Sequence, residues 1–287
     1  MKKSILKKVI AVGIMGVMAL GLAGCGSSTK DTSNNSEDSK VTTDVKDGGI
    51  SLEEVKKKGK LVVGTSADYP PYEFHKEIDG KDTIVGFDID IAKEIAKDMG
   101  VEVEIKDMDF DGLLVASQAG KVDLVIAGMN PTPEREENAD FSDIYYKAEN
   151  CFIVRKGDES KIKSAEDLKG LKIGVQKGSI QEGYAQENFK DSEIKSLAKV
   201  TDLILDLNSN KIDAILVNTP VAETNCNKND TLGMSEYSIT DMQVGAAIAM
   251  KKNSTELKEA VNKSIKRLQD EGKIDEYVAA ANELAEE

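Results

Sequence analysis

From residue 60 onward, the apolar positions of the chain follow two different periods in turn. Leu61–Val63 is a short uninterrupted apolar run, typical of a buried strand, whereas Val101–Ile105 alternates apolar with acidic residues, as in a half-exposed strand. Between them, apolar residues recur at steps of three and four over 89–99, which predicts a helix with Asp88 as its cap and Gly100 as its stop. Repeated strand–helix–strand units predict an α/β fold with a mainly parallel sheet.

The same alternation continues along the chain. Residues 74–81 are interpreted as a polar connection, and Thr132-Pro133-Glu134 is typical of a capped helix start. Ser164–Asp167 has the residue types of a capping box. The remaining expected elements are helices over 112–119 and from 180, and strands over 123–127, 152–155 and 171–175.

Two segments of the chain resemble each other. Gln118–Ile126 and Asn208–Leu216 each contain the end of a helix, a Lys-apolar-Asp turn and a buried strand. Any strand–helix–strand unit can have this pattern, or the echo can mark two lobes of one design. In the second case, groups that bind a ligand are expected where the strands end, at the carboxyl edge of each sheet.

The N-terminus has the pattern of an export signal, with basic residues up to Lys8 and an uncharged run over Val9–Gly24. This run of 16 residues is shorter than the ~20 that a membrane-spanning helix needs. It ends in Leu22-Ala23-Gly24-Cys25, which resembles the bacterial lipobox, in which the Cys is diacylated and the chain is cut before it. A plain secretory peptide with a chance Cys is the alternative.

The lipobox resemblance implies a lipoprotein signal peptide over residues 1–24 and a lipid anchor, with palmitate, on Cys25. Residues 26–49 contain no aromatic and only two aliphatic residues, so residues 25–49 are expected to form a flexible tether. The mature protein is then expected at the extracytoplasmic face of the cell membrane.

Composition excludes several classes of protein. With 31% charged residues and a net charge of -14, the chain does not resemble a polytopic membrane protein or a nucleic-acid binder. One His and no Cys-x-x-Cys pair argue against zinc and thioredoxin-like chemistry, so no metal and no cofactor are expected. Cys151 begins an apolar run and is interpreted as a core residue. Two free thiols are expected at Cys151 and Cys226, with a disulfide between them left open.

One segment points to a family. Gly86–Ala96 (GFDIDIAKEIA) closely resembles the signature of the bacterial extracellular solute-binding proteins, family 3, the receptors of polar amino-acid ABC importers. The same family pattern continues in Asp68–Tyr72, Met108–Phe110, Ala127–Gly128, Thr132–Arg135 and Phe141–Asp143, so that the resemblance covers about residues 52 to 275. It implies a periplasmic-binding-protein-like (type II) fold, with two α/β lobes joined by two crossing hinge strands. Lobe 1 is then expected over 50–146 plus 245–287, and lobe 2 over 147–244.

The resemblance also implies a ligand site. Arg135 matches the family's clamp for the ligand carboxylate, although by itself an Arg among Glu residues is more often a surface ion pair. Ser179 lies where the family binds the carboxylate at a helix N-terminus, and it can equally be an ordinary N-cap, or both. Tyr69 and Phe110 match aromatic walls around the ligand side chain. The other expected contacts are Ser66, Gly128, Met129, Asn130, Gln176, Ile180, Gln181 and Asn218.

Two of these positions bear on specificity. The family usually has an acid, the counter-charge of the ligand ammonium, where this chain has Asn218. A neutral acceptor stabilises an ammonium less than a charged one, so either the affinity is lower here, another acid substitutes, or the ligand is unusual. If Asn218 lies beside the ammonium, Asn218→Asp is expected to tighten binding. Ser66 stands where receptors for basic amino acids tend to have Asp, which favours a neutral polar ligand such as glutamine.

The leading hypothesis is a monomeric binding protein, with no catalytic residues, that delivers a polar amino acid to ABC permease subunits. A dehydratase-type enzyme on the same fold is a second hypothesis, in which Asp68 and Glu73 are the only nearby candidates for a general acid. A sensory lipoprotein is the third, and sequence does not separate it from a transport protein. His75 is interpreted as a surface residue.

Overall fold

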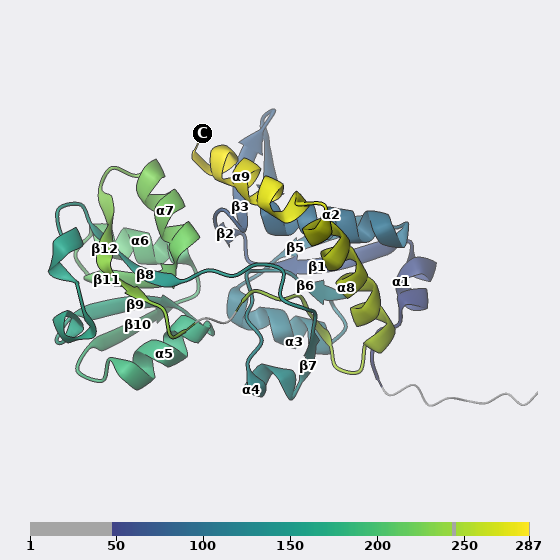
Figure 1. Ribbon diagram of the computed structural model, residues 1–287, viewed down its shortest axis with the longest axis horizontal. Coiled ribbons are helices and arrows are strands. Elements are labelled where there is room, and N and C mark those ends of the chain that lie inside the picture. Colours follow the sequence, from purple (N-terminus) through teal and green to yellow (C-terminus); the bar gives the residue numbers. More distant parts are fainter. Residues whose placement is uncertain (1–47, 243–244, 287) are drawn as a thin grey trace, which may run out of the picture. The chain divides into compact units, whose positions relative to one another are not determined.

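Two five-stranded sheets organise this computed structural model, which describes residues 48–242 and 245–286 (Figure 1). The first sheet has the strand order β5 (Glu102–Asp107), β1 (Lys60–Thr65), β6 (Leu124–Val125), β13 (Ala249–Lys251) and β7 (Ala139–Phe141). The second has the order β10 (Glu193–Leu197), β9 (Lys172–Gln176), β11 (Ala214–Asn218), β8 (Asn150–Arg155) and β12 (Leu232–Ile239). We call the halves that contain them the first lobe and the second lobe.

The two sheets have the same design. In each, the first three strands in this order are parallel, the fourth runs antiparallel to them, and the fifth pairs antiparallel with the fourth. All strands but the fourth therefore run in one direction in each sheet, as expected of a mainly parallel sheet, and the reversed fourth strand, β13 or β8, makes the sheet mixed.

The sequence echo corresponds to this repeated design. Asp123 accepts a hydrogen bond from the backbone N–H of Val62 at 2.8 Å, and Asp213 accepts one from that of Lys172 at 2.9 Å. Each Asp also donates its own backbone N–H to the carbonyl of the same partner residue. The Lys-apolar-Asp turn thus fixes the start of β6 or β11 against the neighbouring strand, which decides in favour of two lobes of one design.

Helices surround both sheets. Their bounds are α1 (Leu52–Lys58), α2 (Phe87–Met99), α3 (Leu113–Gln118), α4 (Pro133–Glu136), α5 (Ile180–Asn188), α6 (Val200–Asn208), α7 (Thr219–Lys228), α8 (Thr255–Asp270) and α9 (Lys273–Glu286). Short 3₁₀ helices cover Phe110–Gly112, Glu159–Lys161 and Ala165–Leu168. Figure 1 shows α8 and α9 beside α2, and these three helices are in mutual contact. Among the residues that the structure describes, no helix is both long enough and apolar enough to span a bilayer.

Three of the local helix signals in the sequence are confirmed. Thr132 caps α4 by accepting from the backbone N–H of Arg135, and Ser164 forms a capping box with Asp167. Gly100 ends α2 in the left-handed conformation. Each signal acts within one turn of chain, so it does not depend on the rest of the fold.

Two expectations for the first lobe were wrong. Residues 74–81 are not a connection but part of a hairpin of β3 (Glu73–Ile78) and β4 (Lys81–Val85), which continues from β2 (Asp68–Tyr69). The outer end of this hairpin is exposed, so it has no apolar alternation, and only the Asp79-Gly80 turn signals it. Asp88 does not cap α2, because Gly86 holds the N-cap position and the Asp88 side chain is fully buried.

Two segments that connect the lobes cross beside each other. Tyr146 and Ala246 form an antiparallel bridge, with hydrogen bonds from Tyr145 N–H to the Ala246 carbonyl and from Ala246 N–H to the Tyr146 carbonyl. A Cβ on Gly245 would lie 2.1 Å from Ile144 Cγ2, so this close crossing requires glycine. The expected lobe boundaries at 146/147 and 244/245 stay a prediction, and they fall in these connecting segments.

The described cysteines are both free thiols. Cys151 is buried in the core, as expected, and Cys226 is half-buried in α7 and packs against that core. The signal peptide, Cys25 and almost the whole of the expected tether lie outside the described residues.

Candidate functional site

Residues from the carboxyl ends of strands in both lobes come together between the two sheets. Tyr69 of the first lobe hydrogen-bonds to Asn218 of the second, with 3.1 Å between the hydroxyl oxygen and Asn218 Oδ1. Arg135 of the first lobe reaches the second with 2.8 Å between Nη2 and the carbonyl oxygen of Gly178. The structure thus unites residues from both lobes that the sequence nominated separately.

The Arg135 guanidinium is positively charged and is held by backbone oxygens of both lobes. Its guanidinium donates to the carbonyl oxygen of Asn130 at 2.6 Å and to that of Gly178, and its Cζ lies 5.6 Å from the Phe110 ring centroid. Burial lowers the pKa of Arg135 to about 10. Within the described ranges no carboxylate forms an ion pair with this guanidinium. The surface ion pair that is usual for such an Arg is therefore not formed, and the geometry suits an external carboxylate.

Gly178 allows the two lobes to approach closely beside Arg135. Its φ is +77°, and a Cβ there would lie 2.9 Å from Asp111 Cβ of the first lobe. Next to it, Lys177 forms a salt bridge with Asp111, with 2.8 Å between Nζ and Oδ2. The loop between β9 and α5 thus contacts the 3₁₀ helix that contains Phe110.

Ser179 is the N-cap of α5. Its hydroxyl accepts from the backbone N–H of Glu182 at 3.2 Å and donates its proton to the Gln176 carbonyl at 2.7 Å. The N-cap alternative is therefore confirmed, and the hydroxyl proton is not available to a ligand carboxylate. Ile180 and Gln181 begin α5, and their backbone N–H groups, in the first helical turn, face no acceptor within the helix.

A chain of neutral polar groups connects Tyr69 with the second lobe. The Tyr69 hydroxyl accepts from the Asn218 backbone N–H at 3.1 Å and donates to Asn218 Oδ1. Asn218 Nδ2 donates to Asn150 Oδ1 at 3.1 Å, and Gln181 Nε2 donates to the same oxygen at 2.9 Å. Burial raises the pKa of the Tyr69 hydroxyl, so it stays protonated. Tyr69 is thus more than an aromatic wall, and Asn150 is a site residue that sequence reasoning missed.

The loop after β6 contributes mainly backbone groups. Gly128 donates its N–H to Asp88 Oδ2 at 2.7 Å, and the Asn130 carbonyl holds Arg135. The Met129 side chain is only 1% exposed and packs in the core of the first lobe. A contact from Met129 to a ligand is therefore left to its backbone.

Asp68 lies at the centre of a second set of contacts between the lobes. Its carboxylate accepts from the Ser66 hydroxyl at 3.1 Å, from Gln176 Nε2 at 3.4 Å and from the backbone N–H of Val200, the first residue of α6. Burial raises the pKa of Asp68, although the hydrogen bonds from the Val200 N–H and the Ser66 hydroxyl oppose the shift. Asp68 therefore orders Ser66 and Gln176, two expected ligand contacts. From the sequence, the only role considered for Asp68 was that of a general acid.

A buried pair of acids supports the first lobe. Asp88 is fully buried and accepts from Gly128 N–H and from the Tyr145 hydroxyl, at 2.8 Å to each carboxylate oxygen. Burial raises the pKa of Asp88 to about 6 and holds that of Glu73 well above its usual range. Glu73 is also fully buried, and within the described part of the chain neither of its carboxyl oxygens accepts or donates a normal hydrogen bond. Asp88 thus links a loop of the site to Tyr145 at the hinge.

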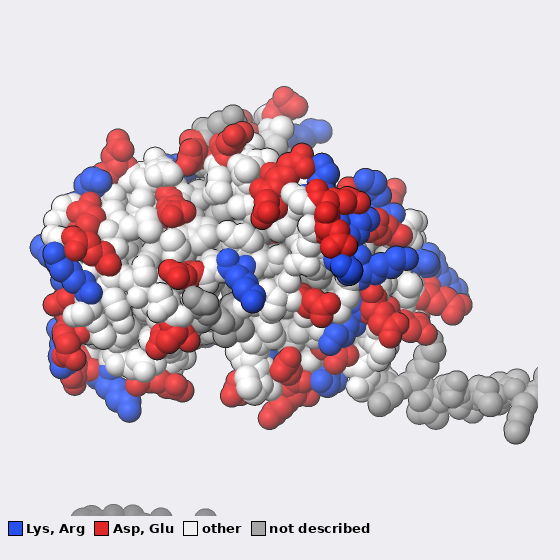
Figure 2. Space-filling model, in the orientation of Figure 1, with Lys and Arg blue, Asp and Glu red and all other residues white. Residues whose placement is uncertain are grey.

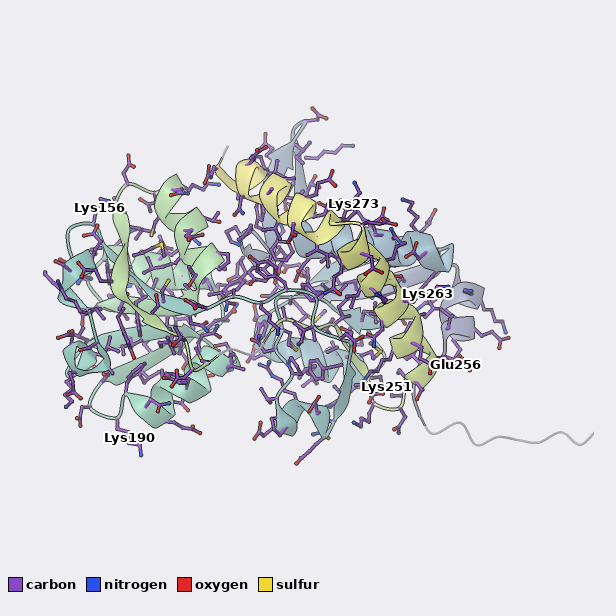
Figure 3. All side chains as sticks on the ribbon, in the orientation of Figure 1. Lys156, Lys190, Lys251, Glu256, Lys263 and Lys273 are labelled. Atoms are coloured by element: carbon purple, nitrogen blue, oxygen red, sulfur yellow. The ribbon has the colours of Figure 1, made fainter. Side chains whose placement is uncertain are left out.

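Charged residues of both signs lie on the surface of the molecule. Figure 2 shows acidic and basic residues interspersed over the visible face, and the labelled Lys156 and Lys190 point outward from the second lobe in Figure 3. His75 is also at the surface, as expected, and lies 2.9 Å from the Asp82 carboxylate through Nδ1. Within the described residues, no three His, Cys, Asp or Glu side chains are grouped to hold a metal ion.

The sequence profile of the bacterial extracellular solute-binding proteins, family 3, matches residues 61–280. The chain belongs to this family. The arginine-binding extracellular protein ArtP of Bacillus subtilis is 41% identical over 76% of this chain and 84% of its own length. The glutamine-binding protein GlnH of the same organism is 30% identical over 94% of this chain and 96% of its own length.

A solved structure of this family has the same fold. It is the amino acid ABC transporter substrate-binding protein AbpA of Streptococcus pneumoniae bound to L-arginine, with a TM-score of 0.80 and 43% identity over 82% of this chain and 99% of that one. The expected two-lobed type II periplasmic-binding-protein fold is thus confirmed. As a member of this family, the protein functions outside the cytoplasm.

Proposed function

We propose that this protein is the amino-acid-binding component of an ABC importer, which clamps a polar L-amino acid between its two lobes. The observation that carries the proposal is the Arg135 guanidinium, which is bound to a carbonyl oxygen of each lobe and has no carboxylate partner among the described residues. A ligand α-carboxylate would supply the missing charge and bind both lobes at once. ArtP, GlnH and AbpA, which bear names of amino-acid-binding proteins, support this function.

Two ligands are candidates. Ser66 in place of an acid favours a neutral side chain such as that of glutamine. Asp68, however, accepts from both the Ser66 hydroxyl and the Gln176 amide nitrogen, so each of these groups presents its oxygen as an acceptor with a negative charge behind it. Such an arrangement suits a donor-rich cation, and we propose L-arginine ahead of L-glutamine. Arginine-binding relatives support this order.

Titration calorimetry with L-arginine and L-glutamine, together with mass spectrometry of ligand released by denaturation, tests both parts of this proposal. We expect L-arginine to bind at least about 10-fold more tightly than L-glutamine. Tighter binding of glutamine would support the inference from Ser66 instead. If no amino acid binds and none is released, the proposed function is wrong.

We further propose that the mature chain begins at Cys25 and is held at the membrane by lipid on that residue. The support is the Leu22-Ala23-Gly24-Cys25 motif after an uncharged run. We expect Cys25→Ser to release the protein from the membrane fraction and leave its ligand affinity unchanged, because two acyl chains supply the anchoring energy. Immunoblots of membrane and soluble fractions measure this, and retention of the variant in membranes would contradict the proposal.

The enzyme hypothesis gains no support from the two acids that it requires. Glu73 has no exposed surface, and Asp68 is 6% exposed and already accepts hydrogen bonds from both lobes. A general acid must reach the substrate proton directly or through one water molecule. We therefore propose binding without chemistry on the ligand. Transport and sensing share this site, and the transport role rests on the family relationship.

A further inference from the structure

Asn150 lies directly opposite Asn218 at one end of the second sheet. The two residues are paired across the antiparallel strands β8 and β11, so their side chains extend from the same face. Asn150 is 1% exposed and Asn218 is 6% exposed. A pair of buried side-chain amides must be oriented so that each nitrogen faces an oxygen, because two facing acceptors in a dry site are costly.

Three contacts fix the orientation of the Asn150 amide. Its Nδ2 faces the backbone carbonyl oxygen of Met242 at 3.4 Å, and a carbonyl oxygen can only accept. Its Oδ1 therefore points the other way, where it accepts from Gln181 Nε2 at 2.9 Å and from Asn218 Nδ2 at 3.1 Å. The two donors and the Met242 carbonyl agree on a single orientation.

The orientation of the Asn150 amide determines the orientation of the Asn218 amide. Because Asn218 Nδ2 is bound to Asn150, Asn218 Oδ1 points toward the first lobe, where the Tyr69 hydroxyl donates to it at 3.1 Å. The Tyr69 hydroxyl accepts from the Asn218 backbone N–H, and its one proton is therefore free to be donated to Asn218 Oδ1. This contact is consistent with the same orientation of the Asn218 amide. The second lone pair of Asn218 Oδ1 is then available to a hydrogen-bond donor between the lobes.

We propose that Asn150 is a positioning residue for ligand recognition, which holds the Asn218 amide with its oxygen toward the ligand and makes the site specific for an amide at position 218. This inference rests on the proposed function, in which the ligand amino group donates to Asn218. The positioning role of Asn150 also reverses the effect on binding that the family pattern suggests for an acid at position 218. In Asn218→Asp, a carboxylate oxygen would replace Nδ2 and face Asn150 Oδ1, and Gln181 and the Met242 carbonyl oppose rotation of Asn150.

Thermal unfolding of single and double variants at positions 150 and 218 tests the positioning role of Asn150 without any ligand. We expect Asn218→Asp to lower Tm by about 4 °C or more at neutral pH, since it places two acceptors in contact. Asn150→Ser should lower Tm by about 2 °C or more in the wild-type background but raise it in the Asn218→Asp background, because a serine hydroxyl can donate to the carboxylate. If Asn150→Ser destabilises both backgrounds equally, or Asn218→Asp is as stable as wild type, the proposal is overturned. Asn150→Thr fills more of the space and replaces Asn150→Ser if the latter does not fold.

Titration calorimetry with L-arginine and L-glutamine tests the link to recognition. We expect Asn150→Ser to weaken binding about 5-fold in the wild-type background, the loss of one oriented hydrogen bond, and less than about 2-fold in the Asn218→Ala background. A purely structural role would give equal losses in both, which would overturn the proposal. Failure of the wild type to bind either amino acid, with the unfolding cycle as expected, would count instead against the proposed function.

Discussion

Replacing Arg135 by alanine is expected to weaken binding of the amino-acid ligand at least about 30-fold, or about 2 kcal/mol. The guanidinium donates to the carbonyl oxygens of Asn130 and Gly178 and is uncompensated by any carboxylate of the described chain. Its removal leaves the ligand carboxylate desolvated and unpaired between the lobes, which is a larger loss than that of one exposed ion pair. Titration calorimetry with L-arginine, and with L-glutamine in parallel, measures the effect.

Two further variants separate the carboxylate role from general effects on the lobes. Lys177→Ala removes the neighbouring salt bridge to Asp111, in which the Lys177 side chain is 59% exposed, and we expect it to change affinity less than about 5-fold. Arg135→Lys keeps a charge but not the planar fork, so we expect intermediate binding. Unchanged affinity in Arg135→Ala, with a native circular dichroism spectrum, would refute the carboxylate role.

The buried acid Glu73 is expected to make the fold less stable as the pH rises. Burial raises the pKa of Glu73 well above 4.5, and that of Asp88 from 3.8 to about 6. Above the unfolded-state pKa of each group, the unfolded chain releases a proton that the folded protein keeps. Stability therefore decreases from about pH 4 to about pH 6 because of Asp88, and further at higher pH because of Glu73.

Replacing Glu73 by glutamine is accordingly expected to stabilise the protein by about 1 to 3 kcal/mol at about pH 8 and to have little effect near pH 4. The amide is neutral at every pH in this range and brings an N–H donor next to the Asp88 carboxylate. Urea unfolding at several pH values measures the difference. The matched control is Glu77→Gln, an exposed position on the same strand β3, which should change neither stability nor its pH dependence. A wild-type pH slope in Glu73→Gln would contradict this account.

The elements of the fold were largely predictable, because their signals are local. The apolar steps of α2, the cap at Thr132 and the capping box at Ser164 each involve residues within one to four turns of chain. The hairpin of β3 and β4 was missed for the same reason. Its outer part is exposed, so burial leaves no period in its sequence, and the Asp79-Gly80 turn was its single local signal.

The family pattern nominated the candidate site residues, but it did not give the hydrogen bonds that they form in the structure. Ser179 was nominated as a ligand contact, and its hydroxyl proton is instead bound to the Gln176 carbonyl. Asp88 was expected to cap a helix, and it instead connects Gly128 with Tyr145, 57 positions farther along the chain. A motif shows which residues are present at a position, whereas a hydrogen bond depends on which partners the fold brings within reach.

The sequence alone therefore determined the alternation of strands and helices and the family, because these follow from periodicity and short motifs. Only the tertiary structure decided that Asn150 holds Asn218, that Asp68 of the first lobe binds the start of α6 in the second, and that Arg135 spans both lobes. Each of these contacts joins residues that are distant in the chain. Their geometry is set by strand pairing and by the approach of the lobes, which no local pattern of hydrophobic and polar residues encodes.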